Sequence, residues 1–162
     1  MFIALDIIVT RLFSIWLVLG IEKVSIQPLV YMFAAYMIGP WYSIAAFCVS
    51  DVLGMFLFPQ SATFFWIFTV VAAVRAAYYG FALYKKPLKL WYSAAVIFIG
   101  IIAIEILLNT YIMSVLYTNS FLYIVSIKFI FKPMFIPLYI FIFYGTMKIL
   151  LKVPEVKRII NN

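Results

Sequence analysis

Three charged side chains lie deep inside long apolar stretches of the chain: Arg11, Asp51 and Arg75. At 1.5 Å of rise per helical residue, each lies about ten residues from one end of its stretch, so the three share roughly one level. A charge facing lipid costs about 2.5 to 3.5 kcal/mol at the bilayer centre. We therefore expect Asp51 to be the structural ion-pair partner of Arg11 or Arg75. A role for Asp51 and Arg75 in ligand binding stays open.

A second polar group occurs in the last third of the chain. Glu105 and Asn109 are four residues apart, and so are Lys128 and Lys132, which places each pair on one helix face. The simplest interpretation pairs Glu105 with one of the lysines and lets Lys128 extend its ammonium outward to water.

The deep charges do not balance. Four cations (Arg11, Arg75, Lys128 and Lys132) face two anions (Asp51 and Glu105), if Asp6 reaches the cytoplasmic surface. Unpaired ions are penalised in hydrocarbon. Either some lysines are neutral or reach water, or the interior accepts an anionic ligand of about two charges.

Aromatic side chains gather where the outer ends of the expected helices meet. They are Phe64, Phe65, Trp66, Tyr111, Tyr117, Phe121 and Tyr123. Such residues form an interface belt in many membrane proteins, and they could also stack on a flat ligand. The residues expected to contact a ligand are Arg11, Phe65, Trp66, Glu105, Asn109, Tyr111, Lys128 and Lys132.

Catalytic chemistry finds little support in the sequence. There is no His for proton transfer, no Gly-x-Ser-x-Gly, no HExxH and no Gly-rich phosphate loop with Lys. No residues have the spacing of a metal site, and we expect neither enzymatic activity nor a cofactor. Any uphill transport must therefore draw its energy from a partner.

The elements that position these residues are membrane helices. The chain is 69% hydrophobic and 10% charged, far below the roughly 25% charged content of soluble domains. We expect an all-α integral membrane protein, a single domain over 1–162 with six helices in a compact bundle. The expected spans are about 2–19, 28–38, 41–58, 63–82, 90–112 and 121–151. Strands are not expected, because the apolar runs are continuous.

Lysines and arginines set the expected orientation. Lys85, Lys86 and Lys89 follow the fourth span, and further basic residues lie at and beyond the end of the sixth. The positive-inside rule then places both termini in the cytoplasm, and it also accounts for the net charge of +7 without nucleic acid. On the third span, small residues at 43, 46, 50 and 54 form a stripe that lets a neighbouring backbone approach.

Several short runs, taken in order, resemble one family of membrane proteins. They are TRLFSIWLVLGIEKVSI at 10–26, MIGP at 37–40, SDVLGMFLFP at 50–59, YYG at 78–80 and LLNTYIMSVLY at 107–117. Together they resemble the substrate-binding S components of energy-coupling factor (ECF) vitamin transporters, and most closely the folate-type members.

The resemblance implies a six-helix protein in the plasma membrane of a prokaryote. Such a protein binds a vitamin with high affinity, here folate or a similar anionic vitamin, in a pocket that opens outward. It associates with a transmembrane coupling subunit and two ATP-binding subunits, which hydrolyse the ATP. Docking to the coupling subunit would involve Ala4, Gly39 and Pro40. Another vitamin or a queuosine-type precursor is the alternative ligand, and a non-transport membrane assembly factor is the alternative function.

Overall fold

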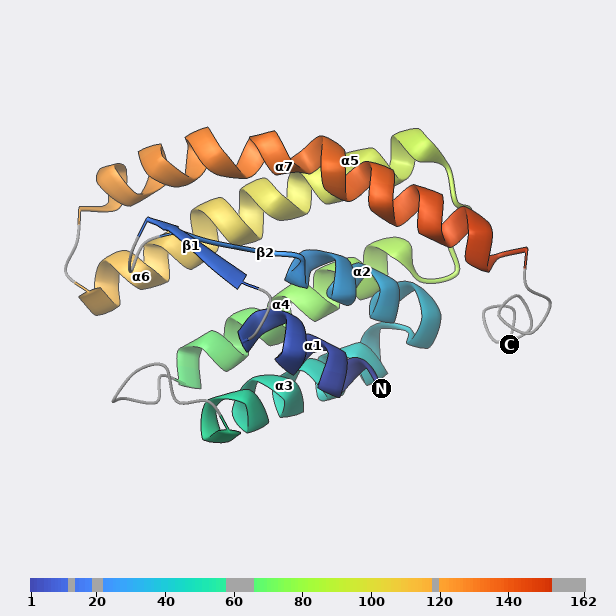
Figure 1. The fold of residues 1–162 in the computed structure, drawn as a ribbon, viewed down its shortest axis with the longest axis horizontal. Coiled ribbons are helices and arrows are strands. Elements are labelled where there is room, and N and C mark those ends of the chain that lie inside the picture. Colours follow the sequence, from blue (N-terminus) through green and yellow to red (C-terminus); the bar gives the residue numbers. More distant parts are fainter. Residues whose placement is uncertain (12–13, 19–21, 58–65, 118–119, 153–162) are drawn as a thin grey trace.

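The computed structural model describes residues 1–11, 14–18, 22–57, 66–117 and 120–152. The described chain is helical apart from one β-hairpin (Figure 1). Its elements are α1 (Phe2–Arg11), β1 (Ser14–Val18), β2 (Glu22–Ser25), α2 (Gln27–Ile38), α3 (Pro40–Leu57), α4 (Trp66–Leu83), α5 (Leu90–Gly100), η1 (Ile101–Leu108), α6 (Asn109–Tyr117) and α7 (Phe121–Leu150).

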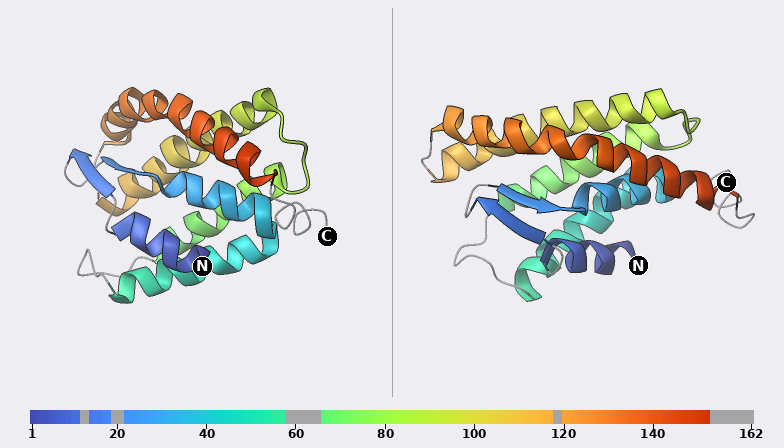
Figure 2. Two further views of the ribbon diagram at one scale, coloured as in Figure 1. Left: turned by 45° about the vertical axis from the view of Figure 1, so that its right-hand side comes forward. Right: turned by 45° about the horizontal axis from the view of Figure 1, so that its top comes forward.

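The helices form two layers with α2 between them. One layer holds α7 beside the continuous rod of α5, η1 and α6, and the other holds α1, α3 and α4 (Figures 1 and 2). The short helix α2 contacts both layers, through α4 and α3 on one side and α7 on the other.

Helix α2 forms the centre of the core. Its 12 residues rise only about 18 Å, too little to cross about 30 Å of hydrocarbon. Eight of them are buried, and the Tyr31 ring stacks on Phe47 of α3 with 3.7 Å between centroids. On the other side, the rings of Phe33 and Tyr36 pack against Phe143 of α7. The protein therefore surrounds α2 on both sides, as such a short apolar segment requires.

Four helical stretches of the described chain are long and apolar enough to span a membrane. They are Pro40–Leu57, Trp66–Leu83, Leu90–Val115 and Phe121–Leu150. Their bounds lie within a few residues of the ranges expected for the last four spans. Residues 63–65 of the expected fourth span lie outside the described residues, and residue 151 of the expected sixth span follows the end of α7. Helices α1 and α2 are shorter, so the described residues contain four helical stretches of spanning length, and the expected count of six membrane helices stays a prediction.

The predicted helix over 2–19 is wrong at residues 14–18, while residues 12, 13 and 19 lie outside the described residues. The chain instead forms the antiparallel hairpin β1–β2, with Ser14 opposite Ser25 and an irregularity in register between Trp16 and Val18. A short apolar run does not distinguish strand from helix by itself, and SIWLV is rich in β-branched and aromatic residues. The hairpin is tied to α7, since the Tyr139 hydroxyl donates to the Ser25 carbonyl oxygen at 3.1 Å.

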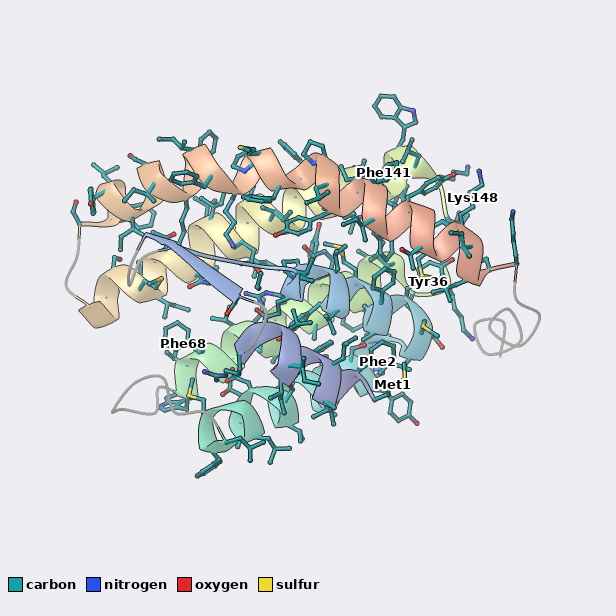
Figure 3. All side chains as sticks on the ribbon, viewed as in Figure 1. Met1, Phe2, Tyr36, Phe68, Phe141 and Lys148 are labelled. Carbon is teal, nitrogen blue, oxygen red and sulfur yellow. The ribbon has the colours of Figure 1, made fainter. Side chains whose placement is uncertain are left out.

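The N-terminus and the end of α7 lie toward the same end of the bundle (Figure 1). The connections α2–α3 and α4–α5 are at this end too (Figure 1). Lys148 and Tyr36 lie toward this end and Phe68 toward the other (Figure 3). The lysines here are exposed: Lys85, Lys86, Lys89, Lys148 and Lys152. This end is therefore the basic end of the described molecule, which is the arrangement that the positive-inside rule associates with the cytoplasm.

Helices α3 and α4 approach so closely that one position has no room for a side chain. A Cβ added at Gly80 would lie 2.5 Å from the Cα of Pro40. Gly39 has a φ of +82°, which favours glycine, and packs against the Tyr84 ring. Gly39 and Pro40 are both buried, so these two expected docking residues belong to the internal packing of the bundle, whereas Ala4 is exposed.

Replacing Gly80 by Ala tests this contact. The new Cβ meets backbone, which cannot rotate away, so we expect a loss of about 1 to 3 kcal/mol in stability. Gly145→Ala is the matched control, since nothing lies within 4 Å of its added Cβ. Thermal unfolding in detergent should show a lower midpoint for Gly80→Ala alone. Equal midpoints for the two variants would contradict the close approach.

Candidate functional site

Polar side chains from six different elements meet in the interior of the bundle. They are Asp6 (α1), Gln27 (α2), Ser50 (α3), Arg75 (α4), Glu105 (η1) and Lys132 (α7). We call this set the central polar network. Asp6, Ser50, Arg75 and Glu105 are buried, and buried polar groups need partners inside the protein.

Glu105 is the branch point of the network. Its Oε1 lies 2.7 Å from Nε of Arg75, and its Oε2 lies 3.2 Å from Nζ of Lys132. Arg75 is 7% exposed and Glu105 is 5% exposed. The Arg75 contact is an ion pair without hydrogen-bond alignment, because neither Nε nor Oε1 has a hydrogen-bond partner by geometry. Lys132, in contrast, donates a hydrogen bond to Oε2. One carboxylate thus binds α4 and α7 to the rod that carries it.

Arg75 is also held by α2. Its Nη1 donates to Oε1 of Gln27 at 3.3 Å, and its guanidinium carbon lies 5.1 Å from the centre of the Tyr31 ring. The second contact is a cation–π interaction, which is favourable when the cation is desolvated. Because Tyr31 in turn stacks on Phe47, Arg75 is fixed by the hydrophobic core as well as by charge.

Asp6 completes the network on the opposite side. Ser50 donates to its Oδ2 at 2.6 Å, Thr10 donates to its Oδ1 at 3.4 Å, and the Gln27 side chain hydrogen-bonds it as well. The expectation that Asp6 reaches the cytoplasmic surface is therefore wrong, since Asp6 is buried. The small side chain of Ser50 has the packing role expected of the stripe on α3 and a polar role besides, because it joins α3 to α1.

The backbone around Glu105 is not an ordinary α-helix. Residues Ile101–Leu108 form a π-helix, and the N–H of Asn109 reaches the carbonyl of Ile104, five residues back. Such turns are rare and often lie at functional sites, because the extra residue per turn changes where the side chains point. The four-residue spacing that places two side chains on one face of an α-helix does not apply to a π-helix. The spacing of Glu105 and Asn109 therefore does not show that they lie on one face.

The expected pairing of Asp51 with Arg75 is wrong. Arg75 pairs with Glu105, and the Thr69 hydroxyl donates to Oδ2 of Asp51 at 2.7 Å. Arg11 remains near Asp51, which exerts the strongest attraction of any charge acting on it. The Arg11 guanidinium packs over Gly54, where an added Cβ would lie 3.4 Å from Nε. Asp51 and Arg11 thus form a second, half-buried polar group between α1, α3 and α4.

Lys128 does not extend its ammonium to water. The side chain is 2% exposed, and Nζ lies 3.4 Å from Sδ of Met113. Its charge also acts on Glu105. Asn109 is half-buried, and its Oδ1 has no hydrogen-bond partner among the described residues.

The expected aromatic contacts are not brought to the central polar network. Trp66 is 69% exposed at the start of α4, and Tyr111 is 62% exposed on α6. Both are typical of an interface belt. Phe65 lies outside the described residues, so its expected role stays a prediction.

Burial of Asp6 changes the balance of charge. The described interior holds four cations (Arg11, Arg75, Lys128 and Lys132) and three anions (Asp6, Asp51 and Glu105), so the surplus is 4 − 3 = +1 instead of the expected +2. Within the described ranges, no group of three or more His, Cys, Asp or Glu could hold a metal ion. The arrangement suits electrostatic binding of one additional negative charge.

Sequence reasoning missed Gln27, Tyr31 and Thr69. Gln27 directly precedes Pro28 at the start of an apolar run, which is the place of a polar helix-start residue and gives no sign of a buried partner. Tyr31 and Thr69 lie inside apolar runs. Only the spatial neighbours of these three residues show that they support charges.

Four long apolar helices packed around buried ionic side chains define a multi-pass membrane protein. The crystal structure of FolT bound with folic acid superimposes on this chain with a TM-score of 0.77 and 26% sequence identity, over 88% of this chain and 84% of FolT. The chain therefore has an S-component-like fold. No protein-family model matches its sequence, and no curated protein does.

Replacing Arg75 by Met tests the importance of the network for folding. The change removes the ion pair between Arg75 and Glu105 and one of the hydrogen-bond partners of Gln27, so we expect a loss of about 3 to 5 kcal/mol in the free energy of unfolding, as for other broken buried pairs. Arg11→Met is the matched control, since Arg11 is half-buried and can be replaced at lower cost. The thermal unfolding midpoint of Arg75→Met should be clearly lower than that of Arg11→Met. The reverse order would contradict the central position of Arg75.

Proposed function

We propose that this protein is the substrate-binding S component of an ECF vitamin transporter and that its ligand is folate or a similar anionic vitamin. The observation that carries the proposal is the match to FolT over 88% of the chain at a TM-score of 0.77. The match agrees with the sequence resemblance, which rests on separate short runs. Binding, not catalysis, is the activity proposed.

The interior supports an anionic ligand. Its surplus of one positive charge is costly in hydrocarbon, and a ligand carboxylate would remove that cost. Folate carries two carboxylates on its glutamate, and a surplus of +1 complements only one of them inside the bundle. The second carboxylate must then be accommodated by water or by residues at the outer end.

The proposed orientation places the basic end of the bundle in the cytoplasm of a prokaryotic cell. Exposed lysines on the α4–α5 connection and at the end of α7 support it. The hairpin and the start of α7 then lie toward the outside, at the end opposite the N-terminus and the end of α7 (Figure 1).

Transport would require partners. The sequence has no Gly-rich phosphate loop with Lys, so the energy would come from two ATP-binding subunits acting through a transmembrane coupling subunit. Ala4, which is exposed on α1, supports docking on that helix. The buried Gly39 and Pro40 would contribute by holding α3 and α4 together.

Isothermal titration of the purified protein with folate tests the ligand. We expect saturable binding, and Lys132→Met should weaken it by about 10- to 100-fold, because a hydrogen bond to a charged group contributes about 1.5 to 3 kcal/mol. Lys148→Met is the matched control, since Lys148 is exposed near the basic end. No binding of folate or its reduced forms to the wild-type protein would remove the ligand assignment.

Co-purification tests the partners. A tagged copy expressed in its own host should retain two ATP-binding subunits and one coupling subunit through mild detergent. Introducing a charge on the exposed face of α1, as in Ala4→Glu, should reduce their recovery without changing the yield of the tagged chain. Recovery of other membrane proteins and no ATPase would favour the assembly factor.

A further inference from the structure

We propose that Arg75 and Lys132 form an anion-binding site which Glu105 occupies in the empty protein and which an external carboxylate can occupy in its place. The proposal rests on the proposed function for the identity of its ligand, a carboxylate-bearing vitamin. It adds that Glu105 competes with the ligand and is not a ligand contact.

The geometry of the triad shows that Glu105 is held by charge more than by directed bonds. Its Oε1 is 2.7 Å from Arg75 Nε, yet neither atom has an aligned hydrogen bond. Its other oxygen accepts one hydrogen bond, from Lys132. Glu105 gives up one ion pair and one hydrogen bond when it leaves, and a carboxylate that takes its place between the same two cations restores both contacts.

The two cations approach Glu105 from different helices. Arg75 lies on α4, where Gln27 and Tyr31 hold its guanidinium independently of Glu105. Lys132 lies on α7 directly before Pro133, which interrupts the hydrogen bonds of that helix. Arg75 therefore keeps its position when Glu105 moves, and a preformed cation pair remains for the incoming anion.

The backbone of Glu105 offers a way to move. Glu105 belongs to the π-helical stretch Ile101–Leu108, between α5 and α6. A π-turn holds one more residue than an α-turn, so its conversion or migration along the rod rotates the side chains within it. A rotation of this kind carries the carboxylate away from Arg75 without unfolding the rod.

A third cation, Lys128, also acts on Glu105. Lys128 lies four residues before Lys132 on α7. With a ligand carboxylate present, the interior holds four anions for its four cations. Transfer of Glu105 toward Lys128 therefore leaves no unbalanced charge in the bundle, which is the condition that hydrocarbon imposes.

Acetate tests the site without the vitamin. In Glu105→Gln the cation pair lacks its anion, so acetate should raise the thermal unfolding midpoint of this variant by several degrees, because a ligand that binds only the folded state stabilises it. The wild-type protein, whose pair is occupied, should respond little. Glu105→Gln with Lys132→Met should lose the response, and Asp51→Asn, which removes a carboxylate elsewhere, should not show one.

Folate tests the competition. Glu105→Gln should bind folate about tenfold more tightly than the wild-type protein, since the ligand no longer displaces an internal anion. A pterin that lacks the glutamate should bind both proteins equally. If Glu105 is a structural brace or a ligand contact, folate binding weakens in the variant instead, and the proposal is overturned.

The two measurements separate this inference from the proposed function. Absence of folate binding to every protein removes the function, while the acetate response still decides whether the pair accepts an external carboxylate. An equal acetate response in wild type and Glu105→Gln, or none in either, overturns the inference. If Glu105→Gln cannot be purified, Glu105→Ala replaces it, because it also removes the carboxylate and the same acetate response is expected.

Discussion

A carboxylate buried in an apolar bundle must lie against cations, and the position of Glu105 between Arg75 and Lys132 constrains everything around it. It joins α4 and α7 to the rod between α5 and α6. Through Arg75 and Gln27 the same constraint reaches α2, and through Asp6 and Ser50 it reaches α1 and α3. The central polar network is thus a connection shared by both layers.

The hydrophobic packing supports this network and limits how it can change. Tyr31 stacks on Phe47 and lies under Arg75, so the most central helix cannot shift without disturbing the guanidinium. The close contact between Gly80 and Pro40 holds α3 and α4 in one register. Glu105 and Lys132 can adjust more easily than Arg75, because Glu105 lies in a π-helical stretch and Lys132 lies next to a proline inside α7. A rigid half and an adjustable half together suit a protein that exchanges one anion for another.

Sequence reasoning was reliable for properties that each segment decides by itself. The four long helices follow from apolar length, and the contact of Glu105 with a lysine follows from the cost of an unpaired ion. It failed where two segments had to be placed relative to each other. Arg75 was expected beside Arg11 as a possible partner of Asp51 because depths counted in α-helical steps matched, and Asp6 was expected to reach the cytoplasmic surface. The hairpin after Arg11 was missed because an apolar run of five residues has no distinguishing period.

The amino-acid sequence by itself determined a multi-pass membrane protein with deep charges of both signs and an excess of cations, because composition and hydropathy are sums over local residues. The tertiary structure decided which charge meets which. Partner choice depends on helix rotation, on the π-turn at Ile101–Leu108 and on the burial of Asp6, and none of these is a property of one segment. The burial of Asp6 alone lowers the interior surplus of positive charge from two to one, because it adds a third anion to the interior. That burial follows from the packing of α1 against α3, which no single segment of the sequence specifies.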